Sequence, residues 1–88
     1  MKIASSYAVL IKRSAEKEMD RLPAKTFDRI ASALAALSHE PRPRGCRKLR
    51  GSEQYRLRVG DYRVLYLISD EKRTVEIVAV GHRRDVYG

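Results

Sequence analysis

Arginines are the residues of this sequence best suited to chemistry, and they concentrate after residue 40. A guanidinium carries a permanent positive charge and a planar fork of N–H donors that fits the oxygens of a phosphate. It can position an anion and stabilise developing negative charge, but it does not accept protons near neutral pH. Two groups stand out by their spacing: Arg56, Arg58 and Arg63 flank Gly60-Asp61, and Arg83 and Arg84 precede Tyr87.

Other patterns that carry chemistry are missing from the sequence. It holds no cluster of carboxylates, no Cys/His pair and no glycine loop of the kind that cradles phosphates, which removes most enzyme classes. Cys46 is the single cysteine, so no disulfide framework and no metal-ligand spacing exist, and we interpret it as an incidental loop thiol. We therefore predict neither a cofactor nor a metal.

Composition bounds the size of the protein and the kind of partner. A chain of 88 residues has room for one domain, predicted to span residues 1–88. The net charge of +8 favours a polyanion such as nucleic acid, and an acidic protein fits equally well. No apolar run approaches the roughly 18 residues of a membrane helix, and residues 1–6 lack the apolar core of a signal peptide. We therefore expect a cytoplasmic protein.

The first half of the chain has the patterns of one strand and two helices. Residues 7–12 are apolar and β-branched enough for a central strand that is buried on both faces. Ser14 suits the N-cap of a helix that ends near Leu22, and Pro23 suits the first turn of a second helix. The second helix carries an apolar stripe of Phe27, Ile30, Leu34 and Leu37, so the pair is predicted to form an antiparallel helical hairpin.

The second half is predicted to hold three strands. Residues 39–51, with the sequence HEPRPRGCRKLRG, have the composition of a loop. Residues 54–59 and 62–69 alternate as strands around Gly60-Asp61, which is the signal of a type II′ hairpin. Residues 74–80 form a further β-branched strand, and a basic strip follows at 81–88. The predicted fold is α+β with the order β-α-α-β-β-β, a small, mainly antiparallel sheet carrying the helices on one face.

The hairpin register separates its two faces. A two-residue loop pairs Val59 with Tyr62, and therefore Arg58 with Arg63. Like charges opposed across a ladder cost roughly 0.2 to 1 kcal/mol, which suggests that the arginines serve a function. We interpret their face as an anion-binding surface, the alternative being simple solvated charge. The apolar face, which suits the helix stripe, consists of Tyr55, Leu57, Val59, Tyr62, Val64, Tyr66 and Ile68.

Three segments of the sequence resemble a known family. They are KLRG at residues 48–51, YRLRVGDYRVLY at 55–66 and VGHRRDVYG at 80–88, with the Leu22-Pro23 junction and the HEPRP segment also fitting. Together and in this order they are similar to the RelE toxins of the RelE/ParE superfamily. The resemblance implies a toxin of a type II toxin–antitoxin system. Such a toxin is a metal-independent endoribonuclease that cuts messenger RNA in the ribosomal A site and is restrained by an acidic, RelB-like antitoxin.

The resemblance also implies roles for individual residues. Arg63 and Arg83 would hold the scissile phosphate, and Tyr87 would stack on a base or assist proton transfer, the alternative being a surface tyrosine. His82 is a structural strand-end residue or a minor acid–base candidate. The implied catalytic residues are Arg56, Arg58, Arg63, Arg83 and Tyr87, and the implied RNA-binding residues are Arg44, Arg47, Lys48, Arg50, His82 and Arg84.

One departure from the family pattern affects the mechanism. Arg56 and Arg58 stand where well-known members carry lysines, and arginine is a poor general base. The group that accepts the 2′-hydroxyl proton is therefore left open. Two other functions also stay open at this point: a ParE-type toxin that inhibits DNA gyrase, and a non-catalytic RNA-binding module. Tyrosines of the helix-covered face could not stack bases in such a module.

Overall fold

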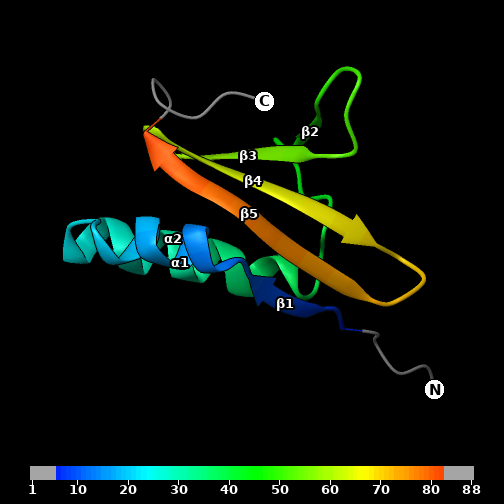
Figure 1. Ribbon diagram of the computed structural model, residues 1–88, viewed down its shortest axis with the longest axis horizontal. Helices are drawn as coiled ribbons and strands as arrows, with labels where there is room; N and C mark the ends of the chain where they lie inside the picture. Colours follow the sequence, from blue (N-terminus) through cyan, green and yellow to red (C-terminus); the bar gives the residue numbers. More distant parts are fainter. Residues whose placement is uncertain (1–5, 83–88) are drawn as a thin grey trace.

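The computed structural model describes residues 6–82 of the chain. Within this range two helices pack beside one sheet (Figure 1), which confirms the predicted α+β class. The predicted order of elements is present, with one further short strand after the second helix. The elements are β1 (Ala8–Ile11), α1 (Arg13–Asp20), α2 (Ala24–Leu37), β2 (Arg47–Lys48), β3 (Tyr55–Val59), β4 (Tyr62–Ser69) and β5 (Thr74–His82).

The strands of the described range form a sheet in the order β1-β5-β4-β3-β2. β1 is parallel to β5 and the other neighbours are antiparallel, so the sheet is mainly antiparallel as predicted. The prediction of a central first strand is wrong, because β1 lies at the edge and leaves Leu10 52% and Ile11 40% exposed. A short apolar run has the same composition in either position, and only the strand order decides how many neighbours it has.

The predicted hairpin is confirmed residue by residue. Val59 pairs with Tyr62, Arg58 with Arg63, and Leu57 with Val64. Gly60 has a φ of +62°, which glycine adopts freely, whereas Asp61 does not have a positive φ. A positive φ at the first loop position alone is the geometry of a type II′ turn, and it fixes which side chains share a face.

The core lies between the helices and one face of the sheet. α1 packs on β5, and α2 contacts β1 and β3. Tyr66 is fully buried and its hydroxyl donates a hydrogen bond to the Pro41 carbonyl at 2.8 Å, which ties the loop after α2 to the core. The buried cluster consists of Ala15 and Met19 of α1, Ile30, Leu34 and Leu37 of α2, and Val64, Tyr66, Val75, Ile77 and Val80 of the sheet.

The helix boundaries differ slightly from the prediction. The N-cap of α1 is Lys12, with an extended backbone and no side-chain cap, so Ser14 lies in the first turn instead of capping it. The Lys12 carbonyl already accepts a hydrogen bond from the Glu16 N–H at 2.9 Å, and this bond starts the helix earlier. Pro23 is the N-cap of α2, one position before the predicted first turn. Both helices are amphipathic, and their apolar faces pack into the same core.

Two features of the sheet were not predicted. Residues 39–51 are not entirely loop, because β2 pairs Arg47 with Arg56 and Lys48 with Tyr55 along the edge of β3. In β5 a bulge leaves Val78 without a partner in β4, since Leu65 pairs with Ala79 and Tyr66 with Ile77. The bulge turns Val80 back onto the core face, and the strand continues beyond the predicted end to His82.

Candidate nucleic-acid interface

Four arginines gather on the sheet face away from the helices. Arg56 and Arg58 alternate with the core-facing residues of β3, and Arg63 lies directly opposite Arg58 on β4. β2 places Arg47 opposite Arg56, and opposed residues of a ladder share a face. We call Arg47, Arg56, Arg58 and Arg63 the arginine face. The two strands of the hairpin and the short β2 thus bring residues from three segments together.

An apolar residue underlies these charges. Leu65 pairs with Arg56 on one side and with Ala79 on the other, on the face that carries no helix, yet only 4% of it is exposed. The Nε of Arg56 is buried as well. Both observations indicate that arginine side chains lie along the sheet and cover Leu65 with their aliphatic stems. The sequence reasoning did not single out Leu65, although its position two residues after Arg63 predicts the shared face.

The arginines also interact electrostatically. Burial lowers the pKa of Arg56, and the neighbouring charges of Arg58, Arg63 and Arg47 lower it further. Within the described residues, the buried Nε of Arg56 has no hydrogen-bond acceptor. Arg42 differs, because its guanidinium forms an ion pair with Asp70 at 3.0 Å and donates to the Tyr55 hydroxyl at 3.2 Å. A multivalent anion would therefore relieve repulsion on the arginine face.

The other predicted site residues do not lie on the arginine face or fall outside the described residues. Lys48 is opposite Tyr55, so it projects to the other side of the sheet from Arg47, and its Nζ lies 3.7 Å from Glu53. His82 is opposite Tyr62, and their ring centroids are 5.5 Å apart, which puts it on the helix side. Arg44 and Arg50 are exposed in the segments that flank β2. Arg83, Arg84 and Tyr87 lie outside the described residues.

The described residues offer no obvious metal site. No group of three or more His, Cys, Asp or Glu side chains in residues 6–82 is placed to hold a metal ion. None of the helices in this range is long and apolar enough to cross a membrane. The arginine face itself offers fixed positive charges and N–H donors.

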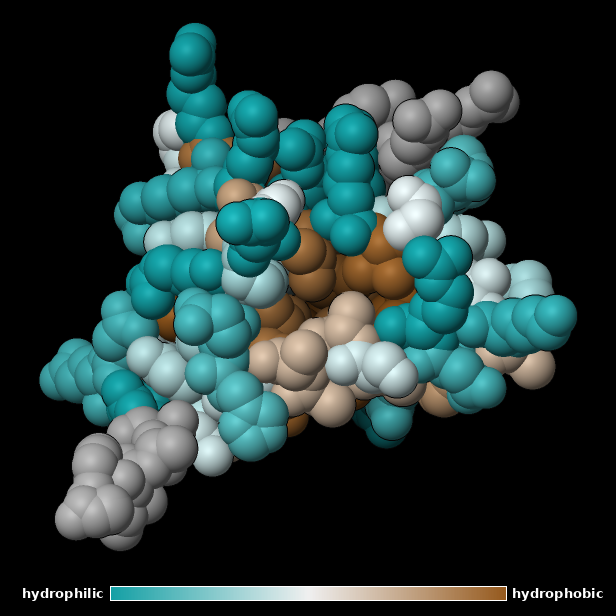
Figure 2. All heavy atoms as spheres, turned by 180° about the vertical axis from the view of Figure 1, so that it is seen from behind, coloured by the Kyte–Doolittle hydropathy of each residue, from teal (hydrophilic) through white to brown (hydrophobic). Residues whose placement is uncertain are grey.

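The surface also shows an apolar region. Seen from behind in Figure 2, hydrophobic atoms lie in a hollow that hydrophilic side chains surround. Leu10, Ile11 and Phe27 are the large hydrophobic residues of the described range that are most exposed. Apolar surface rimmed by polar side chains is typical of sites where proteins bind other proteins.

Comparison with known proteins identifies the class of protein to which this fold belongs. Residues 9–87 match the family described as the ParE toxin of the type II toxin–antitoxin system parDE. The chain belongs to the RelE/ParE family of type II toxin–antitoxin toxins, which confirms the predicted resemblance. It is 36% identical to Toxin RelG of Mycobacterium tuberculosis over 85 residues, covering 92% of this chain and 95% of that protein.

Solved structures of relatives share the fold. The toxin–antitoxin complex RelBE2 of Mycobacterium tuberculosis contains a chain with a TM-score of 0.80 and 33% identity, covering 89% of this chain and 99% of that one. The archaeal RelE–RelB complex of Pyrococcus horikoshii OT3 contains one with a TM-score of 0.81 and 30% identity, covering 92% and 99%. The first is described as a toxin–antitoxin complex and the second as a complex of RelE with RelB.

Proposed function

We propose that this toxin is an endoribonuclease that cleaves messenger RNA on the ribosome. The observation that carries the proposal is the pairing of Arg58 with Arg63 beside Arg56, whose Nε is buried. Opposed like charges cost stability, and a bound anion would offset that cost. The backbone of RNA supplies phosphates at regular spacing. The similarity to relatives named RelE and RelG supports the same function.

The reaction is a transesterification within the RNA. The 2′-oxygen of a ribose attacks the adjacent phosphorus while the bond to the 5′-oxygen of the next nucleotide breaks. The 2′-hydroxyl loses its proton to a base, and the leaving oxygen gains one. The products are a 2′,3′-cyclic phosphate and a 5′-hydroxyl, and the step needs neither a protein nucleophile nor a metal.

The arginines act by position and charge. Arg63, with the predicted help of Arg83, holds the non-bridging oxygens of the scissile phosphate, because a guanidinium fork binds two oxygens at once. Arg56 and Arg58 stabilise the negative charge that grows on the pentacoordinate phosphorus. Arg47 extends this surface along the RNA backbone, and Tyr87 is the proposed stacking or proton-transfer residue. None of the arginines is proposed as the base.

Analysis of the cleavage ends tests this mechanism. The purified toxin is added to ribosomes paused on a defined message, and the ends of the RNA fragments are identified chemically. We expect a cyclic phosphate and a 5′-hydroxyl. Both should form at the same rate when a chelator removes all metal beyond what ribosome integrity needs. A 5′-phosphate on the downstream fragment would exclude attack by the 2′-hydroxyl.

We also propose that an acidic antitoxin restrains this toxin in the cytoplasm, where its ribosomal target lies. The net charge of +8 and the apolar hollow of Figure 2 together suit a partner that has both acidic and apolar residues. The relatives solved as RelBE2 and RelE–RelB complexes support such a partner. Expression of the toxin alone should arrest bacterial growth, and coexpression of its cognate acidic antitoxin should restore it.

Inhibition of DNA gyrase is the second candidate function. The family that matches residues 9–87 is described as the ParE toxin of the parDE system, and this description favours gyrase inhibition. A gyrase inhibitor would not need the paired arginines, so Arg58→Gln should leave its toxicity unchanged. A supercoiling assay with purified gyrase separates the two functions, because the ribonuclease should leave supercoiling unaffected.

A further inference from the structure

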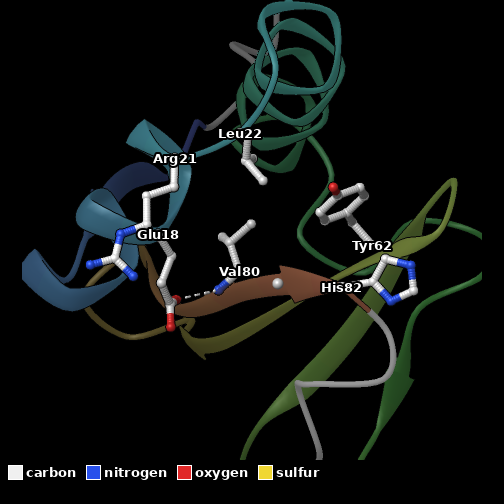
Figure 3. A pocket seen from close by; sticks show the side chains of 7 residues that line it. Glu18, Arg21, Leu22, Tyr62, Val80 and His82 are labelled. Atoms are coloured by element: carbon white, nitrogen blue, oxygen red, sulfur yellow. Dashed lines mark hydrogen bonds between the residues drawn. The ribbon is translucent and has the colours of Figure 1, made fainter.

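A pocket of about 300 Å³ lies on the helix side of the sheet (Figure 3). One of its lining residues, Tyr62, directly precedes Arg63 on β4. α1 and the turn after it form one wall, and the start of β4 and the end of β5 form the other. The pocket is not part of the arginine face, and the proposed cleavage chemistry does not use it. Its lining residues are Glu18, Arg21, Leu22, Tyr62, Val80, Gly81 and His82.

A carboxylate of fixed orientation marks one side of the pocket. The Oε1 of Glu18 accepts a hydrogen bond from the Val80 N–H at 2.8 Å, and the side chain is partly buried (Figure 3). This bond uses one of the several acceptor positions of the carboxylate and holds the group against the edge of β5. Because an ionised carboxylate only accepts hydrogen bonds, a ligand beside Glu18 must present N–H or O–H donors.

The opposite side of the pocket is aromatic. Tyr62 and His82 meet edge to face, with ring centroids 5.5 Å apart and an interplanar angle of 73°. Leu22 and Val80 supply apolar surface between them and Glu18, and Gly81 has no side chain to fill the space (Figure 3). A flat ring with donors on one edge matches this combination of an aromatic wall and a fixed acceptor.

We propose that this pocket is a subsite for a guanine base of the RNA. Guanine presents two neighbouring N–H donors, N1–H and the exocyclic N2 amine, which a carboxylate can accept together. Its O6 is an acceptor that Arg21, at the rim of the pocket, can reach as a donor. The other bases offer a carboxylate only one donor group on this edge. Glu18 is therefore a specificity-determining residue. Tyr62 is the stacking surface, contrary to the expectation for tyrosines of the helix-covered face, because it is only partly buried and lines the pocket.

The position of the pocket fits the proposed cleavage, on which its biological role rests. Tyr62 and Arg63 are consecutive, so one projects to the helix side and the other to the arginine face. Gly81, which lines the pocket, is the residue opposite Arg63. At the end of the sheet a nucleotide can thus place its phosphate on Arg63 and turn a neighbouring base into the pocket, as proteins commonly do with single-stranded RNA.

Binding of mononucleotides tests the pocket without any cleavage. The probes are GMP, AMP, CMP and UMP, titrated into the whole toxin while the methyl NMR signals of Leu22 and Val80 are followed. We expect GMP to shift these signals saturably at the lowest concentration and Glu18→Gln to weaken that binding about tenfold or more, the scale of a lost charge-assisted hydrogen bond. Glutamine keeps an acceptor for the Val80 N–H, and the exposed Glu16→Gln on the same helix is the matched control. If the four nucleotides bind with equal affinity, or if GMP binds Glu18→Gln as tightly as it binds the Glu16→Gln control, the proposal is wrong.

Mapping of cleavage positions on ribosomes supplies the second readout. The wild-type toxin should cut next to guanines, and Glu18→Gln should lose this preference by cutting less often next to guanines than the wild type. Leu22→Phe, which fills the pocket, should do the same, and its thermal unfolding shows whether it remains folded. GMP binding without any RNA cleavage would refute the proposed function but would still support the pocket as a guanine-binding site. Cleavage with a base preference unchanged in Glu18→Gln would refute the pocket alone.

Discussion

Arg58 lies directly opposite Arg63 across the β3–β4 ladder, so two permanent charges are held on one face of neighbouring strands. Burial and the charges around it also lower the pKa of Arg56, which adjoins the pair. We therefore expect the sheet to be less stable than an equivalent sheet with neutral residues at these positions. Sites that trade stability for activity in this way are a common feature of functional surfaces.

The first prediction concerns this trade. Arg58→Gln removes the like-charge opposition, so the variant should unfold at a temperature about 1 to 8 °C higher, from roughly 0.2 to 1 kcal/mol in a domain of this size. The same variant should lose most of its cleavage activity. Thermal denaturation followed by circular dichroism measures the shift, with Lys17→Gln on the exposed side of α1 as the control. A lower unfolding temperature would show that Arg58 stabilises the fold instead.

The second prediction concerns the scissile phosphate. Arg63→Ala and Arg83→Ala should each reduce the single-turnover cleavage rate on the order of a hundredfold or more, the usual effect of removing one transition-state charge donor. Arg63→Lys should recover only part of the rate, because an ammonium cannot bind two oxygens in a planar fork. Saturating concentrations of ribosomes separate binding from chemistry. If the rate at saturation is unchanged, these residues only position the RNA.

The third prediction concerns the extent of the RNA-binding surface. Arg47 shares the arginine face through its pairing with Arg56, whereas Lys48 projects to the other side. For a fully 2′-O-methylated RNA that cannot be cleaved, Arg47→Ala should reduce the slope of log affinity against log salt by about 0.7, as expected for one lost phosphate contact. Lys48→Ala should leave the slope nearly unchanged. Fluorescence anisotropy over a range of salt concentrations measures both, and identical slopes for the two variants would contradict the assignment of faces.

The fourth prediction uses the ion pair at the far end of the sheet. The Arg42 guanidinium, and then the Tyr7 hydroxyl that donates to Asp70 at 2.7 Å, hold the pKa of Asp70 below its ordinary value. A lowered pKa in the folded state stabilises the protein above the unfolded-state pKa and loses that effect as the pH falls through the folded-state pKa. Asp70→Asn should therefore be less stable than the wild type at pH 7, and the difference should vanish in acid below the ordinary range of an aspartate.

Urea denaturation at a series of pH values measures this difference, with Glu71→Gln in the same turn as the control. A difference between Asp70→Asn and the wild type that does not change with pH would mean that the charge of Asp70 is not what stabilises the turn.

The fifth prediction concerns the proton from the 2′-hydroxyl. Arginines cannot accept it, and His82 lies beside Tyr62 on the other side of the sheet. The single-turnover rate should therefore keep rising towards alkaline pH, through Tyr87 or through direct ionisation of the 2′-hydroxyl, since free phenols titrate near pH 10. His82→Gln should leave the shape of the profile unchanged. A plateau above neutrality that disappears in His82→Gln would identify the histidine as the base.

The sequence by itself determined the local parts of this protein. The Gly60-Asp61 turn fixed the pairing of Arg58 with Arg63, because a two-residue loop leaves only one register for the strands beside it. Strict alternation then divided the hairpin into a core face and an arginine face, and the helical spacing of Ile30, Leu34 and Leu37 supplied the partner for the core face. These features depend on residues close together in the chain, so short-range patterns are enough to predict them.

The features that depend on segments far apart in the chain were decided only by the tertiary structure. β1 is an edge strand because β5 is its only neighbour in the described sheet. β2 forms on the side of β3 that β4 does not occupy, where Arg47 pairs with Arg56. The bulge at Val78 changed the alternation of β5, so that Val80 faces the core, where its N–H meets Glu18, and His82 joins Tyr62. Packing of α1 against β5 then created the pocket between them. Strand order and helix docking are set by competition among all parts of the core, which no local pattern records.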